Sequence, residues 1–360
     1  MIMYLITMLL VCIFGTVEYT KRAEQGSIGK EIDASYKARK NVFYIFLILT
    51  FILVGGLRFE VGSDYVAYAR GYYEDLSMVV DRFKTLNEPI IYLITWACRS
   101  IWNEGAFVIF VESAITVLLV FKGIRNYEDG SYVMPLLLYI LYCGWVSSFG
   151  AIRQCMAAAL IFAFSKKGKD DKWWIFRCLI VCFIAFLIHK SAIFVFPILL
   201  LSSRKFDLLQ ILIVLFVAVS MPTIVEHAIP FMNITFDSDY SNHAVNSLRI
   251  AVSFAPVLLL LFSKKEFRKN NSFLINMAVF NALISFTARN SALLYRFYDY
   301  TVMYLMIFIP KCSQLFDKHL RKLYNISVIV LFLVYFWFEI KTGNGGLRDF
   351  NWVFGHWGIY

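Results

Sequence analysis

The chain has 360 residues, of which 60% are hydrophobic, and its mean hydropathy is +0.65. Soluble domains of this length are far less apolar, so the composition excludes a soluble globular protein and indicates a helical membrane protein. The formal net charge of +10 does not require a nucleic-acid partner, because Lys and Arg collect in the cytoplasmic loops of membrane proteins.

Apolar runs that suit membrane-spanning helices recur along the whole chain. The first run lacks the basic start and the cleavage site of a signal peptide, so we expect it to be a retained span. The predicted spans are 1–19, 42–57, 106–121, 132–149, 151–165, 173–188, 191–203, 208–224, 249–263, 272–288, 291–310 and 323–340. The predicted fold class is therefore all-α: a polytopic integral membrane protein with about twelve transmembrane helices. We expect one transmembrane domain over 1–340 and a tail over 341–360.

Basic linkers alternate with the spans and hold most of the Lys and Arg residues. They are 21–40, 122–125, 166–169, 204–205, 264–269 and 311–322. Placing all of them in the cytoplasm gives a consistent alternation. This topology puts both termini outside, together with the loops 58–105 and 225–248, which we expect to help form an active-site cavity.

The short apolar segment from Pro89 to Trp102 contains Arg99. If this segment crossed the membrane, every later basic linker would face outside. We therefore expect it to form a re-entrant or interfacial helix rather than a span.

The segment from Gly55 to Tyr65 leaves the second predicted span and carries Arg58 and Asp64. One interpretation is an anion-binding arginine beside a carboxylate that acts as a base. The alternative is a structural Arg–Asp pair at a helix end, which is the commoner use of an isolated pair. Interfacial tyrosines follow, which suit either a sugar-binding platform or an aromatic belt; they are Tyr65, Tyr68 and Tyr72.

Arg153 and Gln154 lie in the first turn of the predicted helix 151–165. A helix N-terminus offers free N–H groups and a positive dipole to an anion. An arginine there is unfavourable with the dipole and needs a counter-anion. Either a bound phosphate or a carboxylate such as Asp64 or Glu60 would supply it.

His189 and Lys190 form a turn between two predicted spans. Histidine titrates near neutral pH, which suits a general base, although a polar turn that only satisfies backbone groups is the alternative. Arg289 and Arg296 are seven residues apart and would share a face on a continuous helix, unless Asn290 and Ser291 break it. Arg296 is also well spaced for an ion pair with Asp299.

The cations of these segments fall at one boundary of the membrane in the predicted topology. Charge at this depth is expensive and is usually kept for function. A cluster of arginines facing one compartment suits a multiply charged anion such as a lipid-linked pyrophosphate. Asp237-Ser-Asp239 has the form of a metal-binding pair, but so short a motif often arises by chance, and we expect no metal.

Four segments, in order, resemble the pattern of the EpsG-type, Wzy-like polysaccharide polymerases. They are Leu57–Tyr65, Ile152–Ala157, Ile188–Ala192 and Arg296–Tyr298. This chain has Phe59 and Ser63 where the family commonly has Tyr and Thr, which changes the chemistry little. The resemblance covers about residues 1–340 and includes the basic first loop.

The resemblance implies a GT-C-like glycosyltransferase of the bacterial cytoplasmic (inner) membrane. Such proteins join oligosaccharide repeat units carried on undecaprenyl pyrophosphate, which are both donor and acceptor, at the periplasmic or outer face. The product is O-antigen for lipopolysaccharide, capsule or exopolysaccharide, and a chain-length regulator is a partner to be expected. A ligase of finished glycan and a transporter or flippase of lipid-linked sugar remain alternatives.

This chemistry suggests a role for each candidate residue. The leaving pyrophosphate would be stabilised by cations, namely Arg58, Arg153 and Arg296 with Arg289 and Lys190 behind them. Either His189 or Asp64 would remove the proton from the attacking sugar hydroxyl. Side chains with aromatic or amide groups would orient the sugar; they are Gln154, Tyr65, Tyr68, Tyr72 and Tyr298. Because cations stabilise the charge, no metal or other cofactor is expected.

Overall fold

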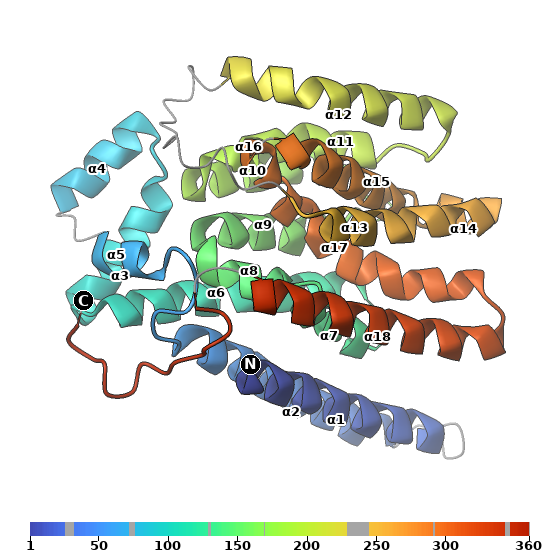
Figure 1. Cartoon of the computed structure of the whole chain (residues 1–360), viewed down its shortest axis with the longest axis horizontal. Helices are drawn as coiled ribbons and strands as arrows, with labels where there is room; N and C mark the ends of the chain where they lie inside the picture. The colour runs from blue at the N-terminus through green and yellow to red at the C-terminus, as the bar shows by residue number, and fades with distance from the viewer. Residues whose placement is uncertain are drawn as a thin grey trace.

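A computed structural model describes residues 1–25, 32–71, 76–128, 131–168, 170–228, 245–290, 292–342 and 346–359. Every regular element in these ranges is a helix, and the one sheet-like contact within them is an isolated antiparallel bridge between Arg58 and Trp352. Figure 1 shows the longer helices lying side by side in a bundle. The predicted all-α fold is confirmed.

The first half of the chain contains α1 (Ile2–Gln25), α2 (Ile32–Gly56), α3 (Tyr65–Gly71), α4 (Leu76–Thr85), α5 (Pro89–Ile101), α6 (Gly105–Tyr127), α7 (Val133–Leu141), α8 (Gly144–Gly150) and α9 (Ile152–Phe164). The second half contains α10 (Trp174–Ile188), η1 (Lys190–Phe194), α11 (Val195–Ser202), α12 (Leu208–Ala228), α13 (Ser247–Leu258), η4 (Leu259–Phe262), α14 (Lys265–Asn270), α15 (Ser272–Thr287), η5 (Ala288–Asn290), α16 (Ala292–Tyr295), α17 (Tyr298–Lys311), η6 (Cys312–Leu315) and α18 (Lys318–Thr342).

Among the described residues, two helices are long and apolar enough to cross a membrane by themselves: α6 and α18. The pair α7 and α8 passes the same test together, with a bend of 45° between the two helices. Cys143 lies at this bend in the left-handed region, with φ 62°. The remaining apolar helical stretches, some of them parts of longer helices such as α1, α2 and α12, are 10–17 residues long. These helices fit a membrane protein.

The predicted span 291–310 is broken, which corrects the sequence analysis. Helix α16 ends at Tyr295 and α17 begins at Tyr298, so Arg296 lies between two helices. At the break, the Gln154 side chain donates a hydrogen bond of 2.9 Å to the Arg296 carbonyl. Arg289 lies in η5, so the two arginines do not share one helix face.

The start of α1 and the C-terminal segment 346–359 meet at one end of the bundle, the end toward the left of Figure 1. The Met1 ammonium group donates to the Arg348 carbonyl at 3.0 Å, and the Tyr4 hydroxyl donates to the Leu347 carbonyl at 3.0 Å. Helices α3, α4 and α5 lie at this end too, which we call the site end. The opposite end, which we call the basic end, carries α14 and the start of α18.

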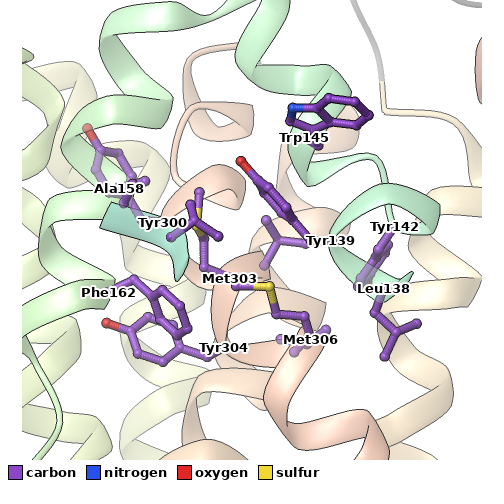
Figure 2. Packing of buried hydrophobic residues seen from close by; sticks show 14 of the residues in the cluster. Leu138, Tyr139, Tyr142, Trp145, Ala158, Phe162, Tyr300, Met303, Tyr304 and Met306 are labelled. Carbon is purple, nitrogen blue, oxygen red and sulfur yellow. The ribbon is translucent and has the colours of Figure 1, made fainter. Parts of the chain in front are cut away.

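A continuous apolar core joins the middle of the bundle (Figure 2). Tyr139 of α7, Trp145 of α8, Phe162 of α9 and Tyr304 of α17 all belong to this core. The Tyr304 ring meets the Phe162 ring edge-on, with centroids 5.3 Å apart. Its hydroxyl forms a 2.6 Å hydrogen bond with Ser165 Oγ, so the polar tip of this buried ring is satisfied.

The segment after α2 is fastened to the end of α8. Arg58 is fully buried, and its guanidinium donates to the carbonyls of Gly55, Val61 (2.9 Å) and Phe149 (3.2 Å). Gly62 has φ +114°, and a Cβ atom at this residue would lie 2.0 Å from the Phe149 carbonyl oxygen. Only glycine allows both this backbone conformation and this approach.

We expect the substitution Gly62→Ala to destabilise the site end. The positive φ alone costs an L-residue about 1–2 kcal/mol, and the contact with Phe149 forces the backbone apart in addition. The measurement is the thermal unfolding midpoint of the purified protein in detergent. Gly168→Ala is the control, because its added Cβ would meet Asp171 at an ordinary 3.4 Å. Equal midpoints for the two variants would contradict the close approach.

Candidate active site

Three groups from two distant parts of the chain converge on the carboxylate of Glu88. Arg153 Nη1 donates to Glu88 Oε2 at 2.6 Å. His189 Nδ1 lies 2.8 Å from Glu88 Oε1, and the Lys190 amide donates to the same oxygen at 3.1 Å. The cluster therefore joins the loop between α4 and α5, the start of α9 and the junction of α10 with η1.

Local structure directs the Glu88 side chain into this cluster. Glu88 is the N-cap residue of α5, and Pro89 takes the first helical position, as proline often does. The Glu88 backbone adopts the left-handed region with φ 53°, which costs a non-glycine residue about 1–2 kcal/mol. Its side chain forms no capping hydrogen bond to α5. The carboxylate is instead used entirely by α9 and by the junction after α10.

Burial by itself would raise the pKa of the Glu88 carboxyl. The hydrogen bond and charge of His189, the charge of Arg153 and the Lys190 amide outweigh burial and lower this pKa from 4.5 to about 2. Hydrogen bonds and opposite charges favour the ionised form of a carboxyl group in this way. Glu88 is therefore an anion at neutral pH.

His189 has one ring nitrogen in use and one without a partner. It lies in extended conformation (φ −150°) between Ile188, the last residue of α10, and Lys190, the first residue of η1. The chain turns directly after it, where the Ala192 amide donates to the His189 carbonyl at 3.0 Å. The Nε2 atom of His189 is buried and has no hydrogen-bond partner within the described part of the chain. Buried polar atoms without a partner are rare and point to strain or function.

Arg153 completes the cluster from the first turn of α9, where the sequence places it. Its Nε donates to the Tyr68 hydroxyl at 3.1 Å, and its guanidinium lies 5.2 Å from the centre of the Tyr68 ring. The Arg153 side chain is 25% exposed. Its observed counter-anion is Glu88, which the sequence analysis did not consider; it named Asp64 and Glu60.

Arg58 lies in different surroundings from those expected. Its guanidinium is enclosed by carbonyl oxygens, by Ser113 Oγ at 2.9 Å and by the rings of Phe149 and Tyr65. No ion pair joins Arg58 to Asp64 among the described residues. Asp64 is half-buried and accepts the Tyr68 amide through its carbonyl at 3.0 Å. Arg58 thus has the environment of a structural residue.

Two of the predicted sugar-contacting residues are held in contacts with other protein groups. Gln154 is buried and donates to the Asp299 carboxylate as well as to the Arg296 carbonyl. Tyr298 is buried and stacks on Tyr295, with ring centroids 5.6 Å apart. Gln154 therefore takes the Asp299 contact that had been expected for Arg296.

The other predicted residues are scattered around the site end. Tyr65 is fully buried and meets Phe59 edge-on, with ring centroids 6.0 Å apart, whereas Arg289 is exposed. Lys190 and Arg296 are half-buried. Tyr72 and the Asp237-Ser-Asp239 motif lie outside the described residues.

The structure also reveals charged groups that the sequence analysis missed. Arg249 of α13 forms an ion pair with Glu339 of α18 and donates to the hydroxyls of Tyr295 and Tyr335. The signal that could have found both residues is a single charged residue inside an apolar run. This pair fastens α13 to α18.

Glu112 of α6 is also a single charged residue inside an apolar run. It is fully buried, and neither of its carboxyl oxygens has a hydrogen-bond partner in the described ranges. Its largest electrostatic partners are Arg153 and Arg58. A buried carboxyl group in a membrane helix usually has a functional role.

Comparison with known protein families shows which family the chain resembles. The family model described as EpsG family matches residues 41–352, a range that contains Glu88, Arg153 and His189. No curated protein and no solved structure matches the chain.

The lowered pKa of Glu88 predicts a pH-dependent stability that Glu88→Gln should lack. Below pH 4.5 the unfolded chain takes up a proton at Glu88, whereas the folded protein does so only near pH 2. The contribution of this carboxylate is therefore complete above pH 4.5 and is lost as the pH falls toward 2. Unfolding midpoints of wild type and Glu88→Gln, measured in detergent from pH 3 to 6, should differ most at pH 6 and converge toward pH 3. A difference that is independent of pH would contradict the predicted shift.

Proposed function

Since the chain belongs to the EpsG family, we propose that it is a glycosyltransferase that polymerises oligosaccharide repeat units carried on undecaprenyl pyrophosphate. The observation that carries this proposal is the convergence of Arg153 and His189 on one carboxylate at one end of the bundle. The cluster brings together a cation suited to phosphate oxygens and a base suited to a hydroxyl group. These are the two groups that glycosyl transfer from a lipid pyrophosphate needs.

The proposal includes the orientation of the protein in the bacterial cytoplasmic membrane. The basic linkers lie in the cytoplasm, as the distribution of Lys and Arg favours, so the site end faces the periplasm or the outside. Twelve spans give this alternation: α1, α2, α6, the α7–α8 pair, α9, α10, η1 with α11, α12, α13 with η4, α15, α17 and α18. Lipid-linked repeat units and a chain-length regulator are the proposed partners at the site end.

The proposed reaction has one transfer step. A hydroxyl group of the acceptor unit attacks the anomeric carbon of the donor sugar while His189 Nε2 takes the hydroxyl proton. The bond between the anomeric carbon and the pyrophosphate oxygen breaks, and its electron pair leaves with the lipid pyrophosphate. Arg153 stabilises the charge that develops on this leaving group, since guanidinium groups bind phosphate oxygens in a bidentate manner.

The remaining cations have supporting roles in this proposal. Lys190 and Arg296, which are half-buried, and Arg289, which is exposed, are proposed as further phosphate contacts in support of Arg153. Arg58 is assigned instead to holding the loop after α2. Tyr68 is buried against Arg153 and is assigned to orienting this arginine. Because Nε2 is closed to solvent, binding of the acceptor requires that neighbouring side chains move.

The test of the proposed function is the glycan ladder from cells that lack this protein. We expect a ladder that collapses to a single repeat unit, is restored by the wild type and is not restored by Arg153→Ala, because the leaving group then lacks its cation. Loss of such a charge contact lowers the reaction rate by about 10²–10³-fold. Arg204→Ala, at an exposed arginine of a basic linker, is the control and should restore the ladder.

Other outcomes would favour the alternatives. A deletion strain without any glycan on its final acceptor would indicate a ligase. Lipid-linked units trapped on the cytoplasmic side would indicate a flippase. A normal ladder in cells that carry Arg153→Ala at wild-type protein levels would remove Arg153 from the site.

The choice of general base is tested separately. We expect His189→Gln to lower polymer yield by about 10²–10⁴-fold, which is the usual worth of a general base. Asp64→Asn should leave the yield within a few-fold of wild type, because within the described ranges the side-chain partners of Glu88 are Arg153 and His189 and not Asp64. The measurement is incorporation of repeat units in membranes with matched protein levels. The reverse order of the two effects would assign the role to Asp64.

A further inference from the structure

Glu88 is the one member of the cluster to which the transfer reaction assigns no direct task. We infer that Glu88 is a positioning residue that holds the proton of His189 on Nδ1 and leaves the lone pair of Nε2 available for the acceptor hydroxyl. The consequence for polymerisation rests on the proposed function, whereas the position of the proton does not.

The geometry around Glu88 Oε1 carries this inference. An ionised carboxylate only accepts hydrogen bonds, so each atom within hydrogen-bond distance of it must be a donor. The Lys190 amide fills one direction at 3.1 Å, and His189 Nδ1 fills another at 2.8 Å. Nδ1 must therefore carry a proton, and in the neutral imidazole Nε2 is then the acceptor. Carboxylates fix histidine tautomers in the same way at metal and catalytic sites.

The lowered pKa of Glu88 supports the ionised form on which this argument depends. The remaining oxygen, Oε2, is taken by Arg153 at 2.6 Å, so Glu88 cannot turn away without breaking an ion pair. The left-handed backbone at Glu88 provides a second constraint, because it fixes the direction in which the side chain leaves the chain.

The same carboxyl group thereby fixes the relative position of the base and the phosphate-binding cation. His189 is held through Oε1 and Arg153 through Oε2. The two groups come from different helices, and transfer requires that both reach one donor sugar at the same time. A single carboxyl group that holds both side chains in place reduces the conformational entropy that they lose when the substrate binds.

The position of the proton can be read directly by ¹⁵N NMR of the full-length protein labelled in its five histidines and purified in detergent. Long-range ¹H–¹⁵N spectra distinguish which ring nitrogen is protonated, and His189→Gln identifies the His189 signals. At pH 8 we expect His189 to be neutral with its proton on Nδ1. A proton on Nε2, or on both nitrogens, would overturn the inference.

Variants of Glu88 test whether this residue is what holds the His189 proton on Nδ1. Glu88→Gln should shift His189 toward a mixture of tautomers, because an amide offers both a donor and an acceptor. Glu88→Asp keeps the carboxylate and should retain the Nδ1-protonated form. Glu104→Gln is the matched control: Glu104 is equally buried at the site end but accepts from the Gly358 amide. Unchanged signals of the other histidines show that each variant is folded, and an unchanged His189 tautomer in Glu88→Gln would overturn the inference.

Polymer yield in cells distinguishes a failure of this inference from a failure of the proposed function. In complemented cells Glu88→Gln should lower polymer yield by about 10²–10⁴-fold, Glu88→Asp should restore part of it, and Glu104→Gln should behave as wild type. If the tautomer changes while the yield does not, Glu88 is not a positioning residue. If deletion of the whole protein leaves the ladder intact, the polymerase proposal fails while the NMR result still decides the proton position.

Discussion

The carboxylate of Glu88 is the contact on which the organisation of the site end depends. It receives Arg153 from α9 and both His189 and the Lys190 amide from the junction after α10. Removal of this carboxylate would leave a partly buried guanidinium without its counter-anion and Nδ1 of a half-buried imidazole without its hydrogen-bond partner. Uncompensated charges of this kind are among the most destabilising groups in a protein interior, and more so at membrane depth.

A second set of contacts fixes the loop after α2 at the site end. Arg58 ties the chain after α2 to the end of α8, and Gly62 allows the two backbones to touch. The C-terminal tail closes over the same loop: Val353 donates to the Leu57 carbonyl at 2.8 Å, and the Trp357 and Trp102 rings stack at 4.7 Å. These contacts hold the loop after α2, the end of α8 and the C-terminal tail together at the site end.

Both ends of the bundle carry cations with specific partners. At the site end Arg153 pairs with Glu88 and Arg249 pairs with Glu339, whereas Lys84 and Arg289 at this end are exposed. At the basic end Arg177 bonds the carbonyls of Phe164 and Lys166 and pairs with Asp171, where it is 36% exposed. Desolvated pairs are directional and suit recognition, whereas exposed lysines and arginines suit orientation of the protein in the membrane.

The sequence by itself determined the helical class, the family resemblance and most helix positions, because long apolar runs and basic linkers are local signals. It also identified Arg153 and His189 as candidate site residues. Only the tertiary structure decided their partner: Glu88 is 65 residues from Arg153 and 101 from His189, and no local pattern encodes contacts at such separations. For the same reason the sequence placed Arg58 at a ligand, whereas folding surrounds it with carbonyls of α2 and α8. The break at Arg296 was likewise hidden, since the side chain that bonds its carbonyl is Gln154 of another helix.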